Sequence, residues 1–362
     1  MNILIVTEKP SVSQAIAPLA RKHWPFDNIT FVHANPYGNI QFSYPRGLKL
    51  REYPLVTEPR NRLALWESWL CAPFVMGADG SLAKGVMSAE LFTAAERIVC
   101  ACDPDATGAV AFDVLMTEVL GSGHADNCAT LELYALDAAS IEYAFANMKP
   151  YVEVCARGRA AGRVKRYFDW NWNVNSLAIF GMVQRNAGVV PTAPPLSKYA
   201  LQLLYGLRSR QPMTEGKIVW LMKHWPGTGK YSPSGRGDGE MGGPASRTPI
   251  IENLLAAGCL ARIVDSAGDP RIPASRMQII EKLVDAGRIA PSADVARTVY
   301  VVSPLGHVLL NSLHPDCEDP DLPFRLDAWC AKGEESKPAI DRYIRTFFGK
   351  QLRYMGAVPA IR

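Results

Sequence analysis

Strands and helices alternate in the hydrophobic pattern of the first 150 residues. Residues 3–7 are a short apolar run, typical of a buried parallel strand, and a polar turn and a helical pattern over 12–20 follow it. The same order returns with a second apolar run at 97–102 and a helical pattern over 109–120. Repeated strand–turn–helix units predict a doubly wound α/β domain built on a parallel sheet. Weaker patterns predict polar strands over roughly 29–56, helices near 60–70, 88–96 and 138–148, and a strand at 130–134.

From residue 151 the pattern becomes mainly helical. Helical periodicity continues to about 187, a proline-rich linker follows, and 196–208 is a further helix candidate. A glycine-rich stretch at 226–244 has the composition of a loop. We therefore divide the chain into five segments: 1–150, 151–190, 191–243, 244–318 and a helical tail at 319–362.

An internal repeat marks the segment 244–318. The tetrapeptide Pro-Ala-Ser-Arg ending at Arg247 returns 29 residues later and ends at Arg276, and apolar positions after the two copies also match. Each copy predicts a capped amphipathic helix closed by a glycine. A strand over 298–303 and a helix that begins at Pro304 follow. Because helix, strand hairpin and helix in this order resemble a winged helix, we expect a mostly α, winged-helix-like domain after the α/β domain.

Charge is distributed unevenly along the chain. The net charge is only +4, but residues 151–232 contain twelve Lys and Arg against three Asp and Glu. A basic centre between more acidic ends is typical of a surface that binds a polyanion, although a solvated basic face without a ligand has the same composition. The sequence has no apolar run of about 18 residues and no signal-peptide pattern. We therefore expect a cytoplasmic protein without a membrane partner.

Carboxylates follow two of the predicted parallel strands. Glu8 comes after the first strand, and Asp103 and Asp105 come after the second. Ligands of open α/β sheets bind at the carboxyl ends of such strands. An Asp-x-Asp turn can hold Mg²⁺ together with water and substrate phosphates, although turns also favour aspartate without any metal. Glu8, Asp103 and Asp105 are therefore the candidate ligands of a Mg²⁺ ion.

Five stretches together resemble the type IA DNA topoisomerases, especially their topoisomerase III branch. They lie in family order: TEKPSVSQAIA (7–17), ACDPDATGAVAFDVL (101–115), DWNWNVNSLA (169–178), GGPASRTPIIENLLAAG (242–258) and VYVVSPLGHVLLNSL (299–313). The resemblance implies that the α/β domain is a TOPRIM domain. In the family a glutamate of this domain lies at the scissile phosphate, a lysine contacts phosphate and aspartates bind Mg²⁺. The matching residues here are Glu8, Lys9, Asp103 and Asp105, although Lys9 fits an exposed turn residue equally well.

The chain departs from the family where catalysis takes place. The family motif DxDREGE is DPDATGA here, so Ala106, Thr107 and Ala109 replace an arginine and two glutamates. We expect metal binding to be weak, because ligand charge tunes affinity. The nucleophilic tyrosine matches Trp220, whose indole has no oxygen to attack phosphorus. Tyr231 is a substitute nucleophile in principle, but its place in the glycine-rich loop favours an exposed tyrosine without that role.

The distance along the chain between two of the matching stretches is also short. Only 69 residues separate Asn175 from Pro244, where the family has two domains that form an arch around DNA. Segment 191–243 is then a shortened remnant of the arch and nucleophile domains, and strand passage is not expected.

The part of the family that faces DNA is retained. Basic residues neutralise phosphates and aromatic faces stack on unpaired bases. For the tryptophans at 170 and 172, a place in the core is the favoured alternative. The candidate nucleic-acid contacts are Arg157, Arg159, Arg163, Lys165, Arg166, Trp170, Arg247 and Arg276.

The sequence favours a nucleic-acid-binding relative of type IA topoisomerases without strand-passage activity, and single-stranded DNA is the favoured ligand. Two alternatives stay open. One is an active Mg²⁺-dependent topoisomerase or nickase that uses a non-standard tyrosine, which the lost nucleophile and carboxylates disfavour. The other is a subunit of a larger DNA-processing assembly, in which a protein partner supplies or replaces the arch.

Overall fold

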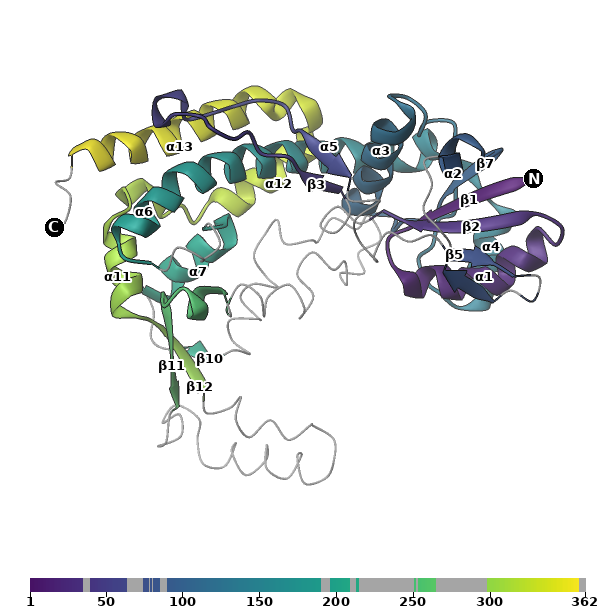
Figure 1. Ribbon diagram of the computed structural model, residues 1–362, viewed down its shortest axis with the longest axis horizontal. Helices are drawn as coiled ribbons and strands as arrows, with labels where there is room; N and C mark the ends of the chain where they lie inside the picture. The colour runs from purple at the N-terminus through teal and green to yellow at the C-terminus, as the bar shows by residue number, and fades with distance from the viewer. Residues whose placement is uncertain are drawn as a thin grey trace.

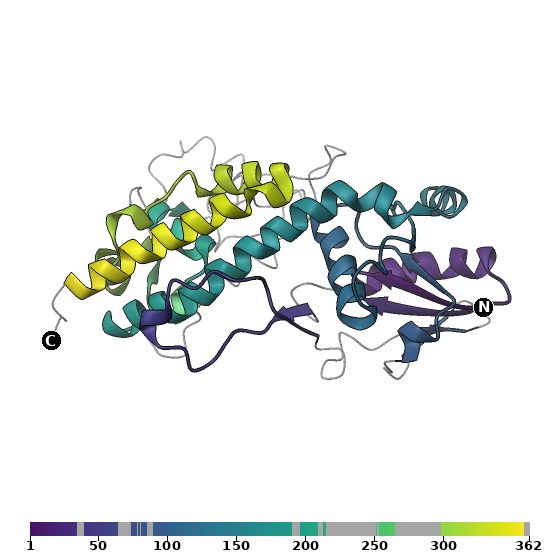
Figure 2. The same ribbon diagram turned by 90° about the horizontal axis from the view of Figure 1, so that it is seen from above.

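A large sheet and a bundle of helices make up the molecule (Figure 1). The computed structural model describes residues 1–34, 40–63, 74–77, 79, 81–84, 90–189, 196–208, 213–214, 251, 253–264 and 298–357. The sheet and its helices form an α/β part, and the other helices form a helical part beside it. The long helix α5 (Tyr151–Asn175) runs from the first part into the second, as Figure 2 shows.

The large sheet has parallel strands at its centre and antiparallel strands at its edges. Its order is β6-β5-β2-β1-β7-β8-β9. In register, Thr7 lies beside His33 and Val6 beside Cys100, so the carboxyl ends of three central strands share one edge of the sheet. The central strands are β1 (Asn2–Thr7), β2 (Asn28–His33), β7 (Arg97–Cys100) and β8 (Ala129–Thr130), and the edge strands are β5 (Phe74–Met76), β6 (Leu82–Lys84) and β9 (Lys149–Pro150).

Helices cover both faces of this sheet, because the apolar side chains of β1 alternate between the faces. Ile3 and Ile5 pack against α1 (Pro10–His23) and α4 (Ala138–Ala146). Leu4 and Val6 pack against α3 (Ala106–Leu120), the short helix α2 (Glu90–Thr93) and the start of α5. The predicted α/β class of the first 150 residues is confirmed.

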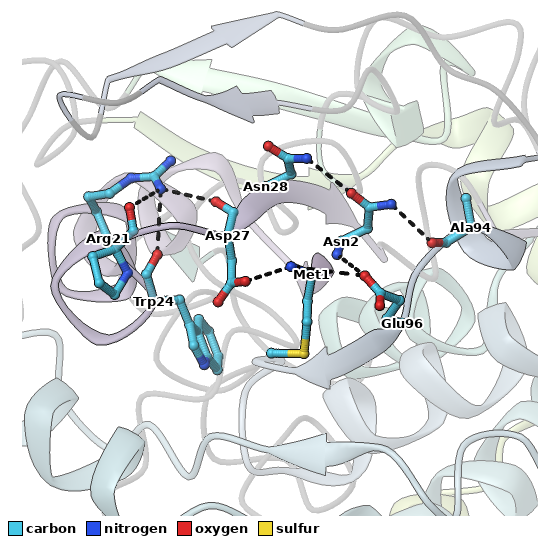
Figure 3. Close-up of polar contacts among 9 residues, drawn as sticks. Met1, Asn2, Arg21, Trp24, Asp27, Asn28, Ala94 and Glu96 are labelled. Carbon is cyan, nitrogen blue, oxygen red and sulfur yellow. Dashed lines mark hydrogen bonds and ion pairs between the residues drawn. The ribbon is translucent and has the colours of Figure 1, made fainter.

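Polar groups around Met1 fasten the amino end of β1 (Figure 3). The α-amino group donates a hydrogen bond to Asp27 Oδ1 at 2.6 Å and lies 4.0 Å from Glu96 Oε2. The backbone N–H of Asn2 donates to the same Glu96 oxygen at 2.7 Å. These contacts tie the start of β1 to the segments that lead into β2 and β7.

The helical part is organised around one large apolar core. The indole of Trp172 lies within it, in ring contact with Phe168, Phe180, Phe347 and Phe348. The helices that contribute are α5, a π-helical turn at Ser176–Phe180, α6 (Gly181–Asn186), α7 (Lys198–Arg208), α11 (Pro304–Asn311), α12 (Leu322–Lys332) and α13 (Lys337–Ala357). A three-stranded antiparallel sheet packs with them, in the order β10 (Met213–Thr214), β12 (Thr298–Val302), β11 (Leu260–Val264).

Residues 44–60 cross from the α/β part to the helical part and return, and we call them the strap (Figure 1). The strap contains a short 3-10 turn, η1 (Leu50–Glu52). The strands on either side of it, β3 (Ile40–Phe42) and β4 (Asn61–Leu63), pair with each other in antiparallel fashion. The strap therefore leaves the α/β part and rejoins it at the same place.

One predicted element differs from the structure, and three predicted segments lie wholly or mostly outside the described residues. The helix expected near 60–70 is wrong over its described part, because 61–63 pairs with β3 as a strand and this tertiary pairing overrides the local pattern. The proline-rich linker, the glycine-rich stretch and most of the repeat lie outside the described residues. Across the part of the chain that the structure describes, no helix has both the length and the apolar character needed to cross a membrane.

Candidate functional site

Three carboxylates meet at the carboxyl edge of the sheet, as the sequence predicts. β1 and β7 are parallel neighbours, so Glu8 after β1 lies near Asp103 and Asp105 after β7. Asp105 caps α3: its Oδ1 accepts hydrogen bonds from two backbone N–H groups of the first turn, at 2.8 Å each. Lys9 Nζ lies 3.5 Å from Asp103 Oδ2. The predicted neighbours are therefore brought together, with Lys9 between the two strand ends.

Glu8 is held in an environment that favours its neutral form. Burial raises its pKa to about 9, and the negative charges of Asp103 and Asp105 act in the same direction. Its Oε1 is buried and has no hydrogen-bond partner among the described residues. Gly108 makes room for this oxygen, because a Cβ at that position would overlap both Glu8 Oε1 and the carbonyl oxygen of Asp103. Glycine is thus required where α3 begins.

The carboxylates do not form a preassembled metal site. Within the described ranges, no group of three or more His, Cys, Asp or Glu side chains is arranged to hold a metal ion. One oxygen of Asp105 is committed to capping α3, Asp103 pairs with Lys9, and Oε1 of Glu8 is buried. These residues do not fit a tight Mg²⁺ site, and weak Mg²⁺ binding at this edge stays a prediction.

Small residues bring α5 close to the amino terminus of α3. A Cβ at Gly158 would lie 3.2 Å from the carbonyl oxygen of Asp105, and one at Gly162 would overlap the carbonyl oxygen of Ala106. The glycines are four residues apart, so they share one face of α5. This close approach places the basic segment of α5 beside the carboxylate edge.

Two of the arginines expected to contact nucleic acid are instead engaged within the protein. Arg163 forms a bidentate pair with Asp113, with N···O distances of 2.8 and 2.9 Å, and Asp113 is only 4% exposed. Arg159 pairs with Asp126 and lies 3.6 Å from Asp113. The two arginines neutralise the carboxylates of Asp113 and Asp126, and through Asp113 they hold α5 against α3.

Two other basic residues of α5 line a cavity of about 440 Å³ between α3, α5, α7 and the strand β3. Lys165 and Arg166 come from α5, and Lys198 comes from the start of α7. Among the described lining residues Asp169 is the one carboxylate. The remaining lining is a mixture of polar, aromatic and small apolar residues: Gln41, Phe42, Tyr44, Ala106, Thr107, Val110, Gly162, Asn173, Ser197 and Tyr199.

Asp169 holds two of these cations in place. Its Oδ2 lies 3.0 Å from Lys165 Nζ, and its Oδ1 pairs with Lys198. Burial alone would raise the pKa of Asp169, but the two ammonium groups outweigh burial and lower it to about 2. Arg166 is fixed separately, by hydrogen bonds to Asn61 and to the carbonyl oxygen of Ile40, and its guanidinium stacks over Phe42. The cavity wall is thus a rigid group of three cations and one anion.

Trp170 is not available to stack on a base, so that part of the prediction is wrong. Its side chain is 1% exposed, its ring stacks on Tyr44, and its Nε1–H donates to Thr57 Oγ1 at 3.1 Å. The alternative that Trp170 and Trp172 belong to the core is confirmed by their burial. Trp170 supports the strap, and Tyr44 and Phe42 carry aromatic surface into the cavity in its place.

The remaining candidates are dispersed. Arg157 is exposed and lines a separate cavity of about 510 Å³ with Tyr134 and Lys332. Trp220, Tyr231, Arg247 and Arg276 lie outside the described residues. The structure therefore groups Lys165 and Arg166 with each other, but not with Arg157, Arg159 or Arg163.

Two residues of the cavity were missed in the sequence. Lys198 lies 33 residues beyond Lys165 and follows a proline-rich stretch, and only folding brings the two together. Asp169 opens the stretch DWNWNVNSLA, which resembles a family motif, but nothing in that stretch indicates a pairing with two lysines. The one sequence signal that could have suggested an ion pair at Asp169 is the presence of basic residues shortly before it in the chain.

A scan against protein-family models finds no matching model, and a search of the curated proteins finds no match. A cavity with more cationic than anionic groups, beside the amino-terminal end of a helix, is suited to phosphate or another anion.

Proposed function

We propose that this protein binds nucleic acid, with single-stranded DNA favoured, in the cavity between α3, α5 and α7. The observation that carries the proposal is the convergence of Lys165, Arg166 and Lys198 on one cavity with a single carboxylate, Asp169, among its described lining residues. Asp169 offsets one of the three positive charges, so the wall keeps a cationic surplus.

The aromatic lining favours unpaired bases. Phe42, Tyr44 and Tyr199 line the same cavity as the cations, and base–aromatic stacking contributes about 1–3 kcal/mol per base in single-strand binders. A duplex keeps its bases stacked on each other and cannot place one in such a cavity without unpairing. The combination of phosphate-binding cations and stacking surfaces therefore suits a single strand.

We further propose that the α/β part is a TOPRIM domain, that the region after residue 150 contains winged-helix-like units, and that the chain is a reduced relative of type IA topoisomerases. Glu8, Asp103 and Asp105 at the carboxyl edge of β1 and β7 support this relationship. Because these carboxylates are not arranged to hold a metal ion within the described ranges, no step of the proposed function uses one. Strand passage is not part of the proposal, since Trp220 replaces the nucleophile.

The test is fluorescence anisotropy with a labelled single-stranded oligonucleotide at several salt concentrations. Lys165→Gln should weaken binding and lower the log–log salt slope by about one unit, because one phosphate contact is lost. The matched control is Arg185→Gln, which removes one exposed positive charge from α6 outside the cavity. If Lys165→Gln keeps its fold and binds with unchanged affinity and slope, the cavity is not the binding site.

A further inference from the structure

A second basic surface lies away from the cavity, along the strap and α13. Together the strap and α13 contain nine Lys and Arg against three Asp and Glu. The two segments lie side by side (Figures 1 and 2): Lys337 at the start of α13 pairs with Glu58 of the strap at 2.9 Å. Near the other end of α13, a Cβ at Gly349 would lie 4.0 Å from Pro54. The strap therefore follows α13 over several turns.

Each of the three acidic residues of this surface already accepts a hydrogen bond or forms an ion pair within the protein. Glu52 Oε2 accepts the backbone N–H of Lys49, Glu58 pairs with Lys337, and Asp341 Oδ1 accepts the hydroxyl of Tyr167 at 2.6 Å. Seven of the nine basic side chains are exposed and have no ion-pair partner in the parts of the chain that the structure describes. These are Arg46, Lys49, Arg51, Arg60, Arg342, Arg345 and Arg353.

Three of these arginines form a stripe on α13. The buried side of the helix is set by Ile340, Ile344 and Phe348. Arg342, Arg345 and Arg353 lie on the opposite half, because steps of three and eight residues return to one face. Arg342 and Arg353 are eleven residues apart, which corresponds to about 16 Å along the helix axis. Side chains on such a rigid element keep their spacing without a partner.

We propose that the strap and α13 bind the phosphate backbone of double-stranded nucleic acid. A duplex carries one negative charge per about 1.7 Å of its axis, so a 16 Å stripe faces roughly ten phosphate charges. The surface offers no apolar centre for a protein partner or a membrane, since Leu50, at 38% exposed, is the one large exposed hydrophobic side chain of the described strap and α13. Tyr44, at the start of the strap, stacks on Trp170 and lines the cavity. No aromatic side chain of the described strap and α13 is among the exposed ones, so this surface offers a single strand little to stack on.

This inference rests on the proposed function and extends it: it adds double-stranded nucleic acid as a second ligand, bound on the strap and α13. With a single strand in the cavity and a duplex on the strap and α13, the protein would hold a junction between paired and unpaired nucleic acid. The basic residues of the two surfaces are different, so the charge of each can be removed without the other.

The experiment measures anisotropy with a labelled 20-base-pair duplex and, separately, a labelled 20-nucleotide single strand. The variant combines Arg342→Gln, Arg345→Gln and Arg353→Gln. Its control, with the same change in net charge, combines Lys22→Gln, Arg97→Gln and Lys149→Gln on exposed positions of the α/β part. A second variant, Arg46→Gln with Lys49→Gln and Arg51→Gln, tests the strap alone. Thermal unfolding verifies that each variant is folded.

We expect the α13 variant to weaken duplex binding about tenfold or more and to lower the log–log salt slope by about two to three units, because up to three phosphate contacts are lost. Single-strand affinity should change much less, and the control should keep most of its duplex affinity. The proposal is overturned if the wild-type protein does not bind the duplex, or if the folded variants retain wild-type affinity and slope. It is also overturned if the control loses as much affinity as the α13 variant. Failure of Lys165→Gln to affect single-strand binding would reject the cavity proposal but leave this one standing.

Discussion

The side-chain amide of Asn175 forms two hydrogen bonds with the backbone of Leu55, 120 residues away: Leu55 N–H donates to Oδ1 at 2.8 Å and Nδ2 donates to the Leu55 carbonyl at 2.6 Å. One turn earlier, Asn171 makes the same pair of contacts with Thr57, at 2.9 and 3.1 Å. Both asparagines are fully buried. Two side chains of α5 thus replace the neighbouring strand that an extended segment would normally pair with.

Replacing Asn175 by alanine should therefore loosen the strap. The loss of both contacts leaves a backbone donor and acceptor of Leu55 unpaired, which should lower the free energy of unfolding by about 1 to 3 kcal/mol. Urea unfolding measures this change, and trypsin should cleave faster after the basic residues of the strap. The control Asn186→Ala, at an exposed position of α6, should stay within about 0.5 kcal/mol of wild type. Equal stability of the two variants would contradict the role given to Asn175.

Glycine 108 offers a test of how tightly the carboxylate edge is packed. In Gly108→Ala the new Cβ would overlap Asp103 and Glu8, so we expect a loss of about 1 to 3 kcal/mol. The matched control is Gly206→Ala in α7, where a Cβ meets no atom within 4 Å. There alanine should be neutral or should stabilise the helix by up to about 1 kcal/mol. Chemical denaturation of both variants measures the change in the free energy of unfolding, which should be a clear loss for Gly108→Ala and zero or a gain for Gly206→Ala.

Glu8 gives the stability of the protein a definite pH dependence. Its pKa is about 9 in the folded protein against 4.5 as the ordinary value, mainly because the side chain is buried. The folded state then binds the proton more tightly than the unfolded state, so the free energy of unfolding falls as the pH rises from about 5 to about 9. Glu8→Gln cannot lose a proton, and it should exceed wild type by about 1 to 3 kcal/mol at pH 9 and match it near pH 5.

Thermal unfolding in EDTA at a series of pH values measures this effect. The control Glu153→Gln removes an exposed carboxyl from the start of α5 and should leave the wild-type slope in place. A wild-type protein that becomes more stable between pH 5 and pH 9, or a Glu8→Gln variant with the same slope, would argue against a protonated Glu8.

Magnesium should bind weakly at the carboxylate edge. With one oxygen of Asp105 used as a helix cap and Asp103 paired with Lys9, few ligand oxygens are free. Calorimetric titration should give a dissociation constant in the millimolar range, because the ligand charge count is low. Asp103→Asn should weaken the binding further. Micromolar affinity would mean that another residue completes the site.

The protein should neither relax supercoiled DNA nor form a covalent adduct with it. Trp220 replaces the nucleophile and cannot form a phosphodiester, and Ala106, Thr107 and Ala109 supply none of the charge that stabilises a developing oxyanion. The assay uses negatively supercoiled plasmid and a labelled oligonucleotide across divalent ions. Relaxed topoisomers, or a denaturant-resistant band that disappears in Tyr231→Phe, would support the enzyme hypothesis instead.

The local sequence pattern was sufficient to predict the central strands β1 and β7 of the α/β part, because their apolar side chains are buried on both faces of the sheet. The apolar run at 3–7 and the strand–turn–helix order around 97–120 correspond to β1, β7 and α3 within a few residues. The same order correctly placed Glu8, Asp103 and Asp105 at one edge. The strap was not foreseen, since its bonds come from Asn171 and Asn175, which lie over 110 residues later.

The charged residues were the hardest to interpret. Arg163 and Lys165 are two positions apart in a uniformly basic stretch, yet one neutralises Asp113 and the other lines the cavity. Only the rotation of α5 against α3 decides between these roles, and that rotation depends on the close contacts of Gly158 and Gly162. Composition reports how much charge a segment carries but not which side chains face a carboxylate.

The strap also affects the order in which the parts of the protein can fold while the chain is being synthesised. Its residues leave the ribosome early, but Asn175 follows Leu55 by 120 residues and Lys337 follows Glu58 by 279. Until those partners emerge, Tyr53 and Val56 have no apolar core to cover them. Loops of this length are slow to close, so the nascent chain carries an undocked strap for most of its translation. The apolar cores of the α/β part include no residue beyond 155, so it is the strap and the helical part that reach their final state only when α13 arrives.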